Sequence, residues 1–352
     1  MKIESRVALA PLTTLGVGGD AAHFVRAEHE TELAGALAWA KQRALEVRVL
    51  GGGSNVVVAD AGFSGLVIDM GLRGVRIHNH GADVEVRAAA GEPWDEFVAA
   101  MVSRGYQGLE CLSGIPGRVG ATPIQNVGAY GQEVSETITS VATLDTLKSA
   151  PRTFSNEECK FAYRDSWFKS REPGRYIVTE VTFRLRLVAA PSVRYAELER
   201  HLHSSGTAAP SLSQLREAVL QLRRAKSMLL DESDPNRRSC GSFFVNPLLD
   251  PAQFAGFSAR AAGIASVPQF PQPDGRVKLS AGWLIEQSGL PRGTRDGAVG
   301  LSTKHALALV AHPGASAADV TRFAARVQRA VLERFGVQLE PEPVFWGESA
   351  SE

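Results

Sequence analysis

The chain has 352 residues, and at about 150 residues per domain this length predicts two or three domains, each long enough to bury a core. Hydrophobic residues make up 44% of the chain and charged residues 22%, which is typical of a globular protein. Lys and Arg together number 38, as do Asp and Glu. This balance argues against an extended nucleic-acid-binding surface, because such a surface needs an excess of positive charge.

The sequence gives little support to membrane insertion, secretion or metal binding. No apolar run reaches the ~18 residues that a membrane-spanning helix needs. Charged residues within residues 1–6 stand where a secretory leader would begin its apolar run. Cys111, Cys159 and Cys240 show neither a metal-binding spacing nor an even count, and the histidines form no paired motif. We therefore expect a cytoplasmic protein without a bound metal.

Periodicity and glycine positions predict an α+β N-terminal half of about 190 residues. The first predicted elements are a helix over residues 30–45 and strands over residues 47–50, 56–58, 66–68 and 84–88. They are followed by a helix over residues 92–104, a long glycine-rich loop over residues 113–131, and strands over residues 138–144 and 176–187.

The composition changes at residues 189–211, which are small, contain proline and resemble a linker. A short helical insert with Tyr195 interrupts this stretch. Beyond it, the pattern predicts a helix over residues 211–224, mixed α/β structure over residues 239–310, and a last helix over residues 318–335 that ends at a glycine.

The run Gly51-Gly52-Gly53-Ser54-Asn55 follows a predicted strand and suggests a turn of backbone N–H groups around an anion. A nucleotide-binding P-loop would end in Lys, which is absent here. A dinucleotide-binding turn would open a helix, whereas the next residues are typical of a strand. Ligand contact and an ordinary hairpin turn both remain open for this run.

The loop over residues 113–131 carries five glycines and almost no charge. Small residues interspersed with Ile, Val and Tyr suit a flat, partly apolar cofactor with a phosphate tail, because backbone amides can meet its polar edge while apolar side chains cover its face. The alternative is a loop that packs on itself.

Four polar segments are candidates for catalysis or ligand binding. Arg164 stands among aromatic residues, which predicts a partly buried guanidinium suited to a carboxylate or phosphate. Ser242 lies outside any nucleophile-elbow motif, so we consider it as a proton donor rather than a nucleophile, with Cys240 as a buried thiol. Taken alone, residues 339–345 are typical of an exposed edge strand, and residues 223–226 of a solvated helix end.

Together these motifs resemble one family, the UDP-N-acetylenolpyruvoylglucosamine reductases (UDP-N-acetylmuramate dehydrogenases). The resemblance extends from residue 15 to residue 345. It is carried, in the family's order and spacing, by residues 51–55, 114–131, 163–166, 241–247 and 339–342. The insert with Tyr195 is similar to that of the longer branch of the family, in which a tyrosine loop closes over the substrate.

The resemblance implies an α+β fold with a two-subdomain FAD-binding part of the vanillyl-alcohol-oxidase type and a C-terminal α/β substrate-binding domain. The implied domains are an FAD-binding subdomain over residues 1–75, to which residues 340–352 return, a second FAD-binding subdomain over residues 76–190, a tyrosine-loop insert and hinge over residues 191–215, and a substrate-binding domain over residues 216–339.

The implied activity is the NADPH-dependent, FAD-mediated reduction of UDP-N-acetylglucosamine enolpyruvate to UDP-N-acetylmuramate, a step of peptidoglycan precursor synthesis. In it, flavin N5 gives a hydride to C3 of the enolpyruvyl group and Ser242 gives a proton to C2. The implied catalytic residues are Arg164, Ser242 and Glu342. The implied substrate residues are Tyr195, Arg223, Lys226, Asn246 and His305. The implied FAD residues are Gly51, Gly52, Gly53, Ser54, Asn55, Ser113, Gly114, Ile115, Gly120, Thr122, Asn126, Gly128, Ala129, Tyr130, Gly131 and Val178. We expect a monomer.

Two alternatives to this interpretation remain open, and the second of them belongs to a different class of protein. One is an FAD-dependent alcohol or sugar oxidase with the same FAD fold, and the other is a nucleotide-binding protein without turnover. The oxidases often attach FAD covalently through His or Cys, and neither glycine loop contains such a residue.

Overall fold

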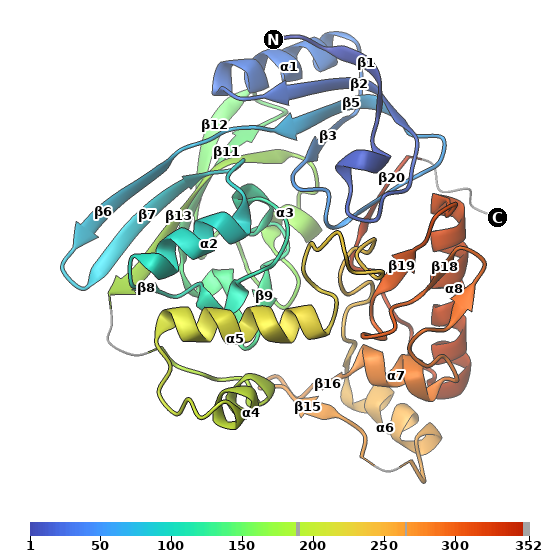
Figure 1. Ribbon diagram of the computed structural model, residues 1–352. Coiled ribbons are helices and arrows are strands. Elements are labelled where there is room, and N and C mark those ends of the chain that lie inside the picture. The colour runs from blue at the N-terminus through green and yellow to red at the C-terminus, as the bar shows by residue number, and fades with distance from the viewer. Residues whose placement is uncertain (188–190, 265, 348–352) are drawn as a thin grey trace. The chain divides into compact units, whose positions relative to one another are not determined.

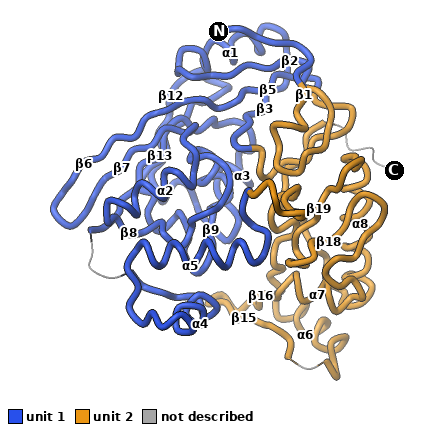
Figure 2. Tube along the Cα trace, viewed as in Figure 1, with its two compact units in different colours: residues 1–7, 21–52, 64–230 blue, residues 8–20, 53–63, 231–352 orange. Residues whose placement is uncertain are grey.

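A computed structural model describes residues 1–187, 191–264 and 266–347 of the chain. The chain forms two compact units (Figure 2). Unit 1 comprises Met1–Val7, Ala21–Gly52 and Ser64–Leu230, and unit 2 comprises Ala8–Asp20, Gly53–Phe63 and Asp231–Glu352. The predicted domain boundary at residue 190 lies outside the described residues, as do residues 348–352 of the predicted returning segment. The predicted division into four parts stays a prediction.

The first sheet of unit 1 has four strands in the order β1-β2-β5-β3 (Figure 1). Their bounds are Glu4–Ala8 for β1, Asp20–Ala27 for β2, Phe63–Met70 for β5 and Val47–Leu50 for β3. Helix α1 (Glu30–Gln42) buries one face of Leu and Ala side chains in the unit's core, as its periodicity predicts. The side chain of Glu32 accepts a hydrogen bond from the His29 amide and so satisfies one free donor at the start of the helix.

The second sheet of unit 1 has the order β12-β11-β13-β7-β6, with β8 also paired to β13. The bounds are Val75–His80 (β6), Asp83–Ala89 (β7), Tyr106–Gln107 (β8), Ile138–Asp145 (β11), Ala150–Ser155 (β12) and Tyr176–Leu187 (β13). The pairs of β13 with β11 and β7 are antiparallel. Helix α2 (Trp94–Ser103) packs Trp94 and Phe97 against Phe183 of β13, with ring centroids 6.1 and 5.3 Å apart, so these aromatic contacts join helix and sheet.

Unit 1 is completed by shorter elements and by two helices near its end. These are β9 (Gly128–Ala129), β10 (Gln132–Glu133), α3 (Trp167–Ser170), α4 (Ala196–Ser204), α5 (Leu212–Ala225) and 3-10 turns at Glu110–Leu112, Val119–Ala121 and Val134–Glu136. Helices α4 and α5 lie side by side (Figure 1) and share a small apolar cluster that includes Leu198, Leu202, Leu215 and Val219. This cluster anchors the insert that carries Tyr195.

Unit 2 has its own apolar core, built mainly from the C-terminal third of the chain. Its strands are β4 (Val56–Val58), β14 (Leu248–Leu249), β15 (Gln269–Pro271), β16 (Val277–Leu279), β17 (Arg295–Asp296), β18 (Val299–Leu301), β19 (Leu309–Ala311) and β20 (Val344–Trp346). Its helices are α6 (Pro251–Arg260), α7 (Ala281–Gln287) and α8 (Ala317–Phe335), with a 3-10 turn at Ala10–Leu12. β20 pairs in parallel with β4, so the C-terminal strand joins the segment that follows the triple glycine.

The predicted fold class is confirmed in its α+β content and in most of its helices and strands. The four long predicted helices are present with ends that differ by a few residues, and Gly336 ends α8 at φ 70°, a left-handed conformation that glycine adopts without strain. Strands β1, β2, β6 and β12 were not predicted. Among the described residues, no helix is long and apolar enough to cross a membrane.

Candidate functional site

In unit 1 the two predicted glycine loops meet backbone to backbone. A Cβ atom added at Gly52 would lie 2.7 Å from the Cα of Gly117, and one added at Gly120 would lie 2.5 Å from the Cβ of Ala90. Both distances are shorter than real contacts of a Cβ atom, so a side chain at Gly52 would force the two loops apart, and one at Gly120 would push the second loop away from Ala90. The glycines therefore provide a close approach of main chain that a simple turn does not need.

The second loop begins with a partly buried polar anchor. The Gly114 amide donates to Oδ1 of Asp95 at 2.5 Å, and both Asp95 oxygens accept hydrogen bonds from Arg216, at 2.6 and 2.8 Å. Burial opposes ionisation of Asp95, but Arg216 and the amide outweigh it and lower the pKa of this carboxyl. The loop start is thus tied to α2 and α5.

The second loop ends in a tight hairpin formed by β9 and β10. Tyr130 and Gly131 both have positive φ, at 48° and 78°, which is the pattern of a two-residue type I′ turn. Tyrosine adopts this conformation at a cost, and its ring is half-buried at the turn. The hairpin therefore places the phenol of Tyr130 away from the loop, against the insert described below.

The remaining predicted FAD residues of unit 1 lie in or beside the same loops. Asn126 is buried and its amide donates to the carboxylate of Glu133 at 2.6 Å and to the carbonyl of Ala162 at 3.0 Å. Ser113 and Thr122 are buried and their hydroxyls donate to backbone carbonyls. Ile115 and Ala129 pack on the core, Gly51 lies beside Ala121, and Val178 is buried in β13 opposite Thr143.

Arg164 lies in a short irregular segment with φ 54°, an uncommon conformation for a side chain of this size. Its guanidinium donates to the carbonyl of Gly128 at 2.9 Å. The backbone carbonyl of Arg164 accepts a hydrogen bond from the ammonium of Lys169 at 2.8 Å. Its guanidinium carbon lies 5.8 Å from the ring centre of Tyr163. The partly buried, aromatic setting predicted for Arg164 is confirmed. The hydrogen bond to Gly128 joins Arg164 to the second glycine loop.

A cluster of four side chains joins the hairpin, the insert and the end of α5; we call it the Tyr–Lys cluster. It consists of Tyr130, Tyr195, Glu197 and Lys226. The two tyrosine rings meet edge to face with centroids 5.5 Å apart. Lys226 Nζ lies 2.6 Å from Oε2 of Glu197 and 5.8 Å from the ring centre of Tyr130. Burial raises the pKa of Tyr130 to about 12, so this phenol stays protonated at neutral pH.

Arg223 is the most deeply placed cation of this region. One of its terminal nitrogens donates to the Met228 carbonyl at 2.8 Å, while its buried Nε has no hydrogen-bond partner among the described residues. Burial lowers the pKa of this guanidinium. A buried donor without a partner costs free energy unless a ligand satisfies it, which favours a bound anion or acceptor here.

Unit 2 brings Asn55 and Glu342 together. The side-chain amide of Asn55 donates to the Glu342 carbonyl at 3.2 Å, and its own carbonyl accepts from the amide of Val344 at 2.9 Å. Gly53 has φ 63°, and a Cβ there would lie 2.0 Å from the carbonyl oxygen of Leu12. Ser54 completes this turn. The C-terminal segment therefore holds part of the predicted cofactor turn.

Ser242 lies in the segment that runs beside the same C-terminal residues. The Glu342 amide donates to the Phe243 carbonyl at 2.8 Å, and the Val245 amide donates to the Glu340 carbonyl at 3.0 Å. Phe243 is fully buried, so the position of the neighbouring serine is set by the core. The structure therefore brings the segments of Ser242 and Glu342 side by side.

Cys240 is also close to this segment in sequence. It is buried, and burial raises the pKa of its thiol to about 12. A thiol with such a pKa is not an effective nucleophile at neutral pH, which supports the expectation of a structural cysteine.

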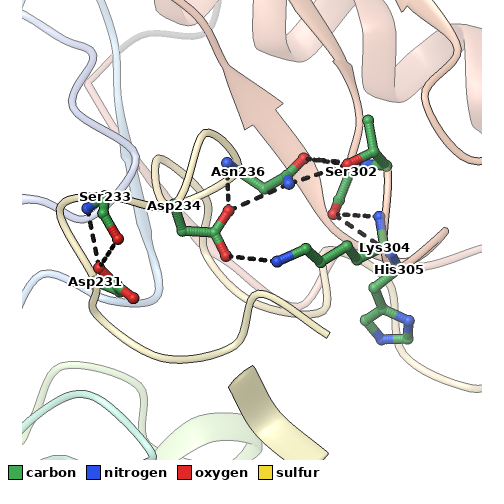
Figure 3. Close-up of polar contacts among 8 residues, drawn as sticks. Asp231, Ser233, Asp234, Asn236, Ser302, Lys304 and His305 are labelled. Atoms are coloured by element: carbon green, nitrogen blue, oxygen red, sulfur yellow. Dashed lines mark hydrogen bonds and ion pairs between the residues drawn. The ribbon is translucent and has the colours of Figure 1, made fainter. Parts of the chain in front are cut away.

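Asn246 and His305 are placed by different contacts. Oδ1 of Asn246 accepts the amide of Ala281 at 2.9 Å and so caps the start of α7. The His305 amide donates to the hydroxyl of the buried Ser302 at 3.3 Å. Figure 3 shows this turn beside a polar network in which Lys304 pairs with the buried Asp234 at 3.2 Å.

The same network joins the turn at residues 302–305 to the segment of Asp234 and Asn236. The side-chain amide of Asn236 donates to the carboxylate of Asp234 at 3.2 Å (Figure 3). It also donates to the hydroxyl of Thr303 at 3.1 Å. Asp234 and Asn236 were not singled out by sequence reasoning, and neither were Glu197 and Asp95. Single polar residues in loops or at helix starts are common, so the sequence contained no signal that separates these four from others.

The site residues of unit 1 fit an FAD group. A Cβ atom at Gly52 would collide with Gly117, so the two loops meet through main chain rather than side chains, which suits the phosphates of a dinucleotide. A family model described as an FAD binding domain matches residues 21–147, which include both loops. The chain therefore contains an FAD-binding domain.

Comparisons with known proteins cover the rest of the chain. A model of the UDP-N-acetylenolpyruvoylglucosamine reductase C-terminal domain matches residues 234–346, a range that holds Ser242, Asn246, His305 and Glu342. UDP-N-acetylenolpyruvoylglucosamine reductase of Thermobifida fusca is 47% identical over 97% of this chain and 97% of that protein. The enzyme of the same name from Salinispora arenicola is 47% identical over 96% of this chain and 94% of its own.

A solved structure agrees with these relatives. The crystal structure of UDP-N-acetylenolpyruvylglucosamine reductase from Thermus caldophilus covers 99% of this chain and 100% of its own, with a TM-score of 0.67 and 27% identity. This match supports the predicted combination of an FAD-binding part and a C-terminal substrate-binding domain. On the strength of the full-length identity, the chain belongs to the UDP-N-acetylenolpyruvoylglucosamine reductase family.

Proposed function

We propose that this protein reduces the enolpyruvyl ether of UDP-N-acetylglucosamine enolpyruvate to the lactyl ether of UDP-N-acetylmuramate, with NADPH as reductant and FAD as bound cofactor. The observation that carries the proposal is 47% identity across nearly the full length of a relative with that name. An alcohol or sugar oxidase sharing only the FAD fold would not account for the match to the C-terminal domain model. A binding protein without turnover has no observation in its favour.

The residues that would hold FAD are those of residues 51–55 and 113–131, with Val178 beside them. When bound, FAD supplies the two-electron chemistry that links oxidation of NADPH to reduction of the alkene. The role of the chain at this point is to keep backbone amides free for phosphate oxygens and to cover the ring system with Ile115 and other small apolar residues.

Arg164 and Glu342 are the groups that we assign to the substrate carboxylate. Addition at C3 leaves negative charge at C2 that spreads into the adjacent carboxylate. A guanidinium that grips this carboxylate stabilises the developing charge, an effect that can be worth ~3–4 kcal/mol. The contacts of Arg164 with Gly128 and Lys169 support this role, because they hold its backbone and one side of its guanidinium in place.

Ser242 is the group that we assign to protonation of C2, the step that sets the lactyl stereocentre. A serine hydroxyl is a weak acid, so the proton must be replaced from solvent or from a neighbouring group. Tyr195, Arg223 and Lys226 would bind the diphosphate of the substrate, and Asn246 and His305 would contact its sugar nucleotide. We further propose that the protein acts as a monomer in the cytoplasm.

A product assay in heavy water tests the proposal. The protein is incubated with NADPH and UDP-N-acetylglucosamine enolpyruvate in D2O. We expect NADPH oxidation that depends on the substrate, and UDP-N-acetylmuramate that carries solvent deuterium at C2. NADPH oxidation at the same rate without the enolpyruvyl compound, or oxygen consumption with simple alcohols, would contradict the proposal and favour an oxidase.

A further inference from the structure

Glu197 is the member of the Tyr–Lys cluster to which the proposed function gives no role. Its carboxylate lies 2.6 Å from the ammonium of Lys226, which that function assigns to the diphosphate. Both side chains are about one-third exposed, at 32% and 31%. An ion pair that water can reach contributes little to folding stability, so stability alone does not explain why Glu197 occupies this position.

The carboxylate of Glu197 and the diphosphate of the substrate would compete for the same cation, the ammonium of Lys226. Glu197 lies in the first turn of α4, two residues after Tyr195, and Lys226 follows the last residue of α5. The negative charge of Glu197 contributes, after burial, to the raised pKa of both Tyr130 and Tyr195, which places the carboxylate near both phenols. A diphosphate that reaches Lys226 would therefore meet a carboxylate already in contact with the ammonium.

We propose that Glu197 is an internal counter-anion of Lys226 that occupies the ammonium while no nucleotide is bound and yields it to a nucleoside diphosphate. Glu197 then sets how tightly the diphosphate binds. The inference rests on the proposed function, which supplies the anion that displaces it.

The packing of α4 permits such an exchange. Leu198 and Leu202 are buried against Leu215 and Val219 of α5, so the helix stays anchored when Glu197 releases Lys226. Glu197 itself is not part of this apolar cluster, and its side chain is about one-third exposed. Movement of one side chain is sufficient, and the helix need not unfold.

The competing explanation is a helix-start role. Acidic residues in the first turn stabilise a helix through its dipole, and α4 carries Glu199 as well as Glu197 there. Under this explanation, removal of the charge would lower thermal stability and leave nucleotide affinity unchanged. The two explanations therefore differ in what each substitution changes.

Calorimetric titration of the FAD-loaded full chain with UDP, under conditions without turnover, distinguishes the counter-anion role from the helix-start role. We expect Glu197→Gln to lower the Kd for UDP about three- to fivefold, because one repulsive charge is removed from a partly exposed site. The Kd for uridine, which lacks phosphate, stays the same. Glu199→Gln is the matched control: it removes the same charge from the same turn, at an exposed position, and leaves the Kd for UDP unchanged.

A double-mutant cycle tests whether Glu197→Gln changes UDP binding through Lys226. In a Lys226→Met background, Glu197→Gln no longer tightens UDP binding, because the ammonium for which the two anions compete is gone. An unchanged Kd with a lower melting temperature in Glu197→Gln would overturn the inference in favour of the helix-start role. Weaker UDP binding would overturn it by showing that Glu197 positions Lys226.

Failure of the inference and failure of the proposed function are distinguishable. If wild-type protein converts the enolpyruvyl substrate but Glu197→Gln leaves the Kd for UDP unchanged, only the inference fails. If wild-type protein does not convert that substrate, the proposed function fails whatever the titrations show. Absence of UDP binding by a wild-type protein that does convert it would remove both Lys226 and Glu197 from the diphosphate site.

Discussion

Asp145 ends β11 and shows how a single carboxylate is held at a strand end. Its oxygens accept hydrogen bonds from Arg175 at 2.9 Å and from the amides of Leu147 and Lys148 at 2.9 and 3.2 Å. The Arg175 hydrogen bond, against some desolvation, lowers the pKa of Asp145 to about 2. Because an unfolded aspartate has a pKa of about 3.9, the ionised form stabilises the folded state above this pH.

The variant Asp145→Asn tests this contribution to pH dependence. We expect it to lower the free energy of unfolding at neutral pH. The gap between wild type and variant should shrink as pH falls from about 4 toward 2, because the wild-type carboxyl becomes protonated in that range. Urea unfolding at a series of pH values measures the gap. A gap that stays constant with pH would show that the charge of Asp145 is not what stabilises the turn.

The variant Ser242→Ala tests the role of Ser242 as the proposed proton donor. We expect reduction of the bound flavin by NADPH to remain nearly intact, because the hydroxyl takes no part in that half-reaction. Reoxidation by the enolpyruvyl substrate should slow by ~10²-fold or more, since general acid catalysis contributes about this much. Rapid mixing of each half-reaction measures both rates. Equal losses in the two half-reactions would remove the assignment.

At the level of elements, α8 begins with two separate sets of acceptors. Ser316 Oγ accepts the Asp319 amide at 3.0 Å, and Oδ2 of Asp319 accepts the Ser316 amide at 3.0 Å, which forms a capping box. Asp60 accepts the amides of Ala317 and Ala318 at 2.7 and 2.9 Å. The donors at the start of this long helix are therefore largely satisfied.

Ser316→Ala should destabilise the protein by about 1 kcal/mol through loss of this cap. Ser258→Ala, at an exposed position inside α6, is the matched control and should change stability by no more than about 0.5 kcal/mol. Denaturant unfolding of both variants measures the difference. Equal effects of the two substitutions would contradict the capping role, and Asp60 would then be the group that satisfies the helix start.

Elements with strong periodicity could be predicted from the sequence, and those stabilised by neighbours could not. The stripe of apolar residues in α8 and the alternation in β13 identify both elements directly. β6 is mostly exposed and rich in His and Asn, and β1 is almost entirely exposed, so neither shows a buried face. Their pairing with β7 and β2 supplies what their own composition lacks.

The candidate site was predictable where a motif had several members. The glycine loops and Arg164 stand out in the sequence because their motifs combine unusual residue types with spacing, whereas the role of Tyr195 is implied only by the resemblance to the family. Glu197 was not identified, because an acidic residue in the first turn of a helix is ordinary. Its contact with Lys226, which lies 29 positions further along the chain, distinguishes it, and no sequence motif links the two residues.

At the scale of the whole molecule, the assigned residues are distributed over both units. Gly51 and Gly52 belong to unit 1, while Gly53, the next residue, belongs to unit 2. Arg164 and Lys226 lie in unit 1, and Ser242 and Glu342 lie in unit 2. Length and composition alone could not indicate that the assigned residues are divided between two compact units.

The central claim is that this chain takes electrons from NADPH on bound FAD and passes them to the enolpyruvyl ether. Anaerobic double mixing, first with NADPH and then with UDP-N-acetylglucosamine enolpyruvate, tests it through the visible absorbance of the flavin. The account predicts bleaching after the first addition and full return of the absorbance after the second. A purified protein that is colourless and takes up no added FAD, or a reduced flavin that the enolpyruvyl compound leaves bleached, would contradict it.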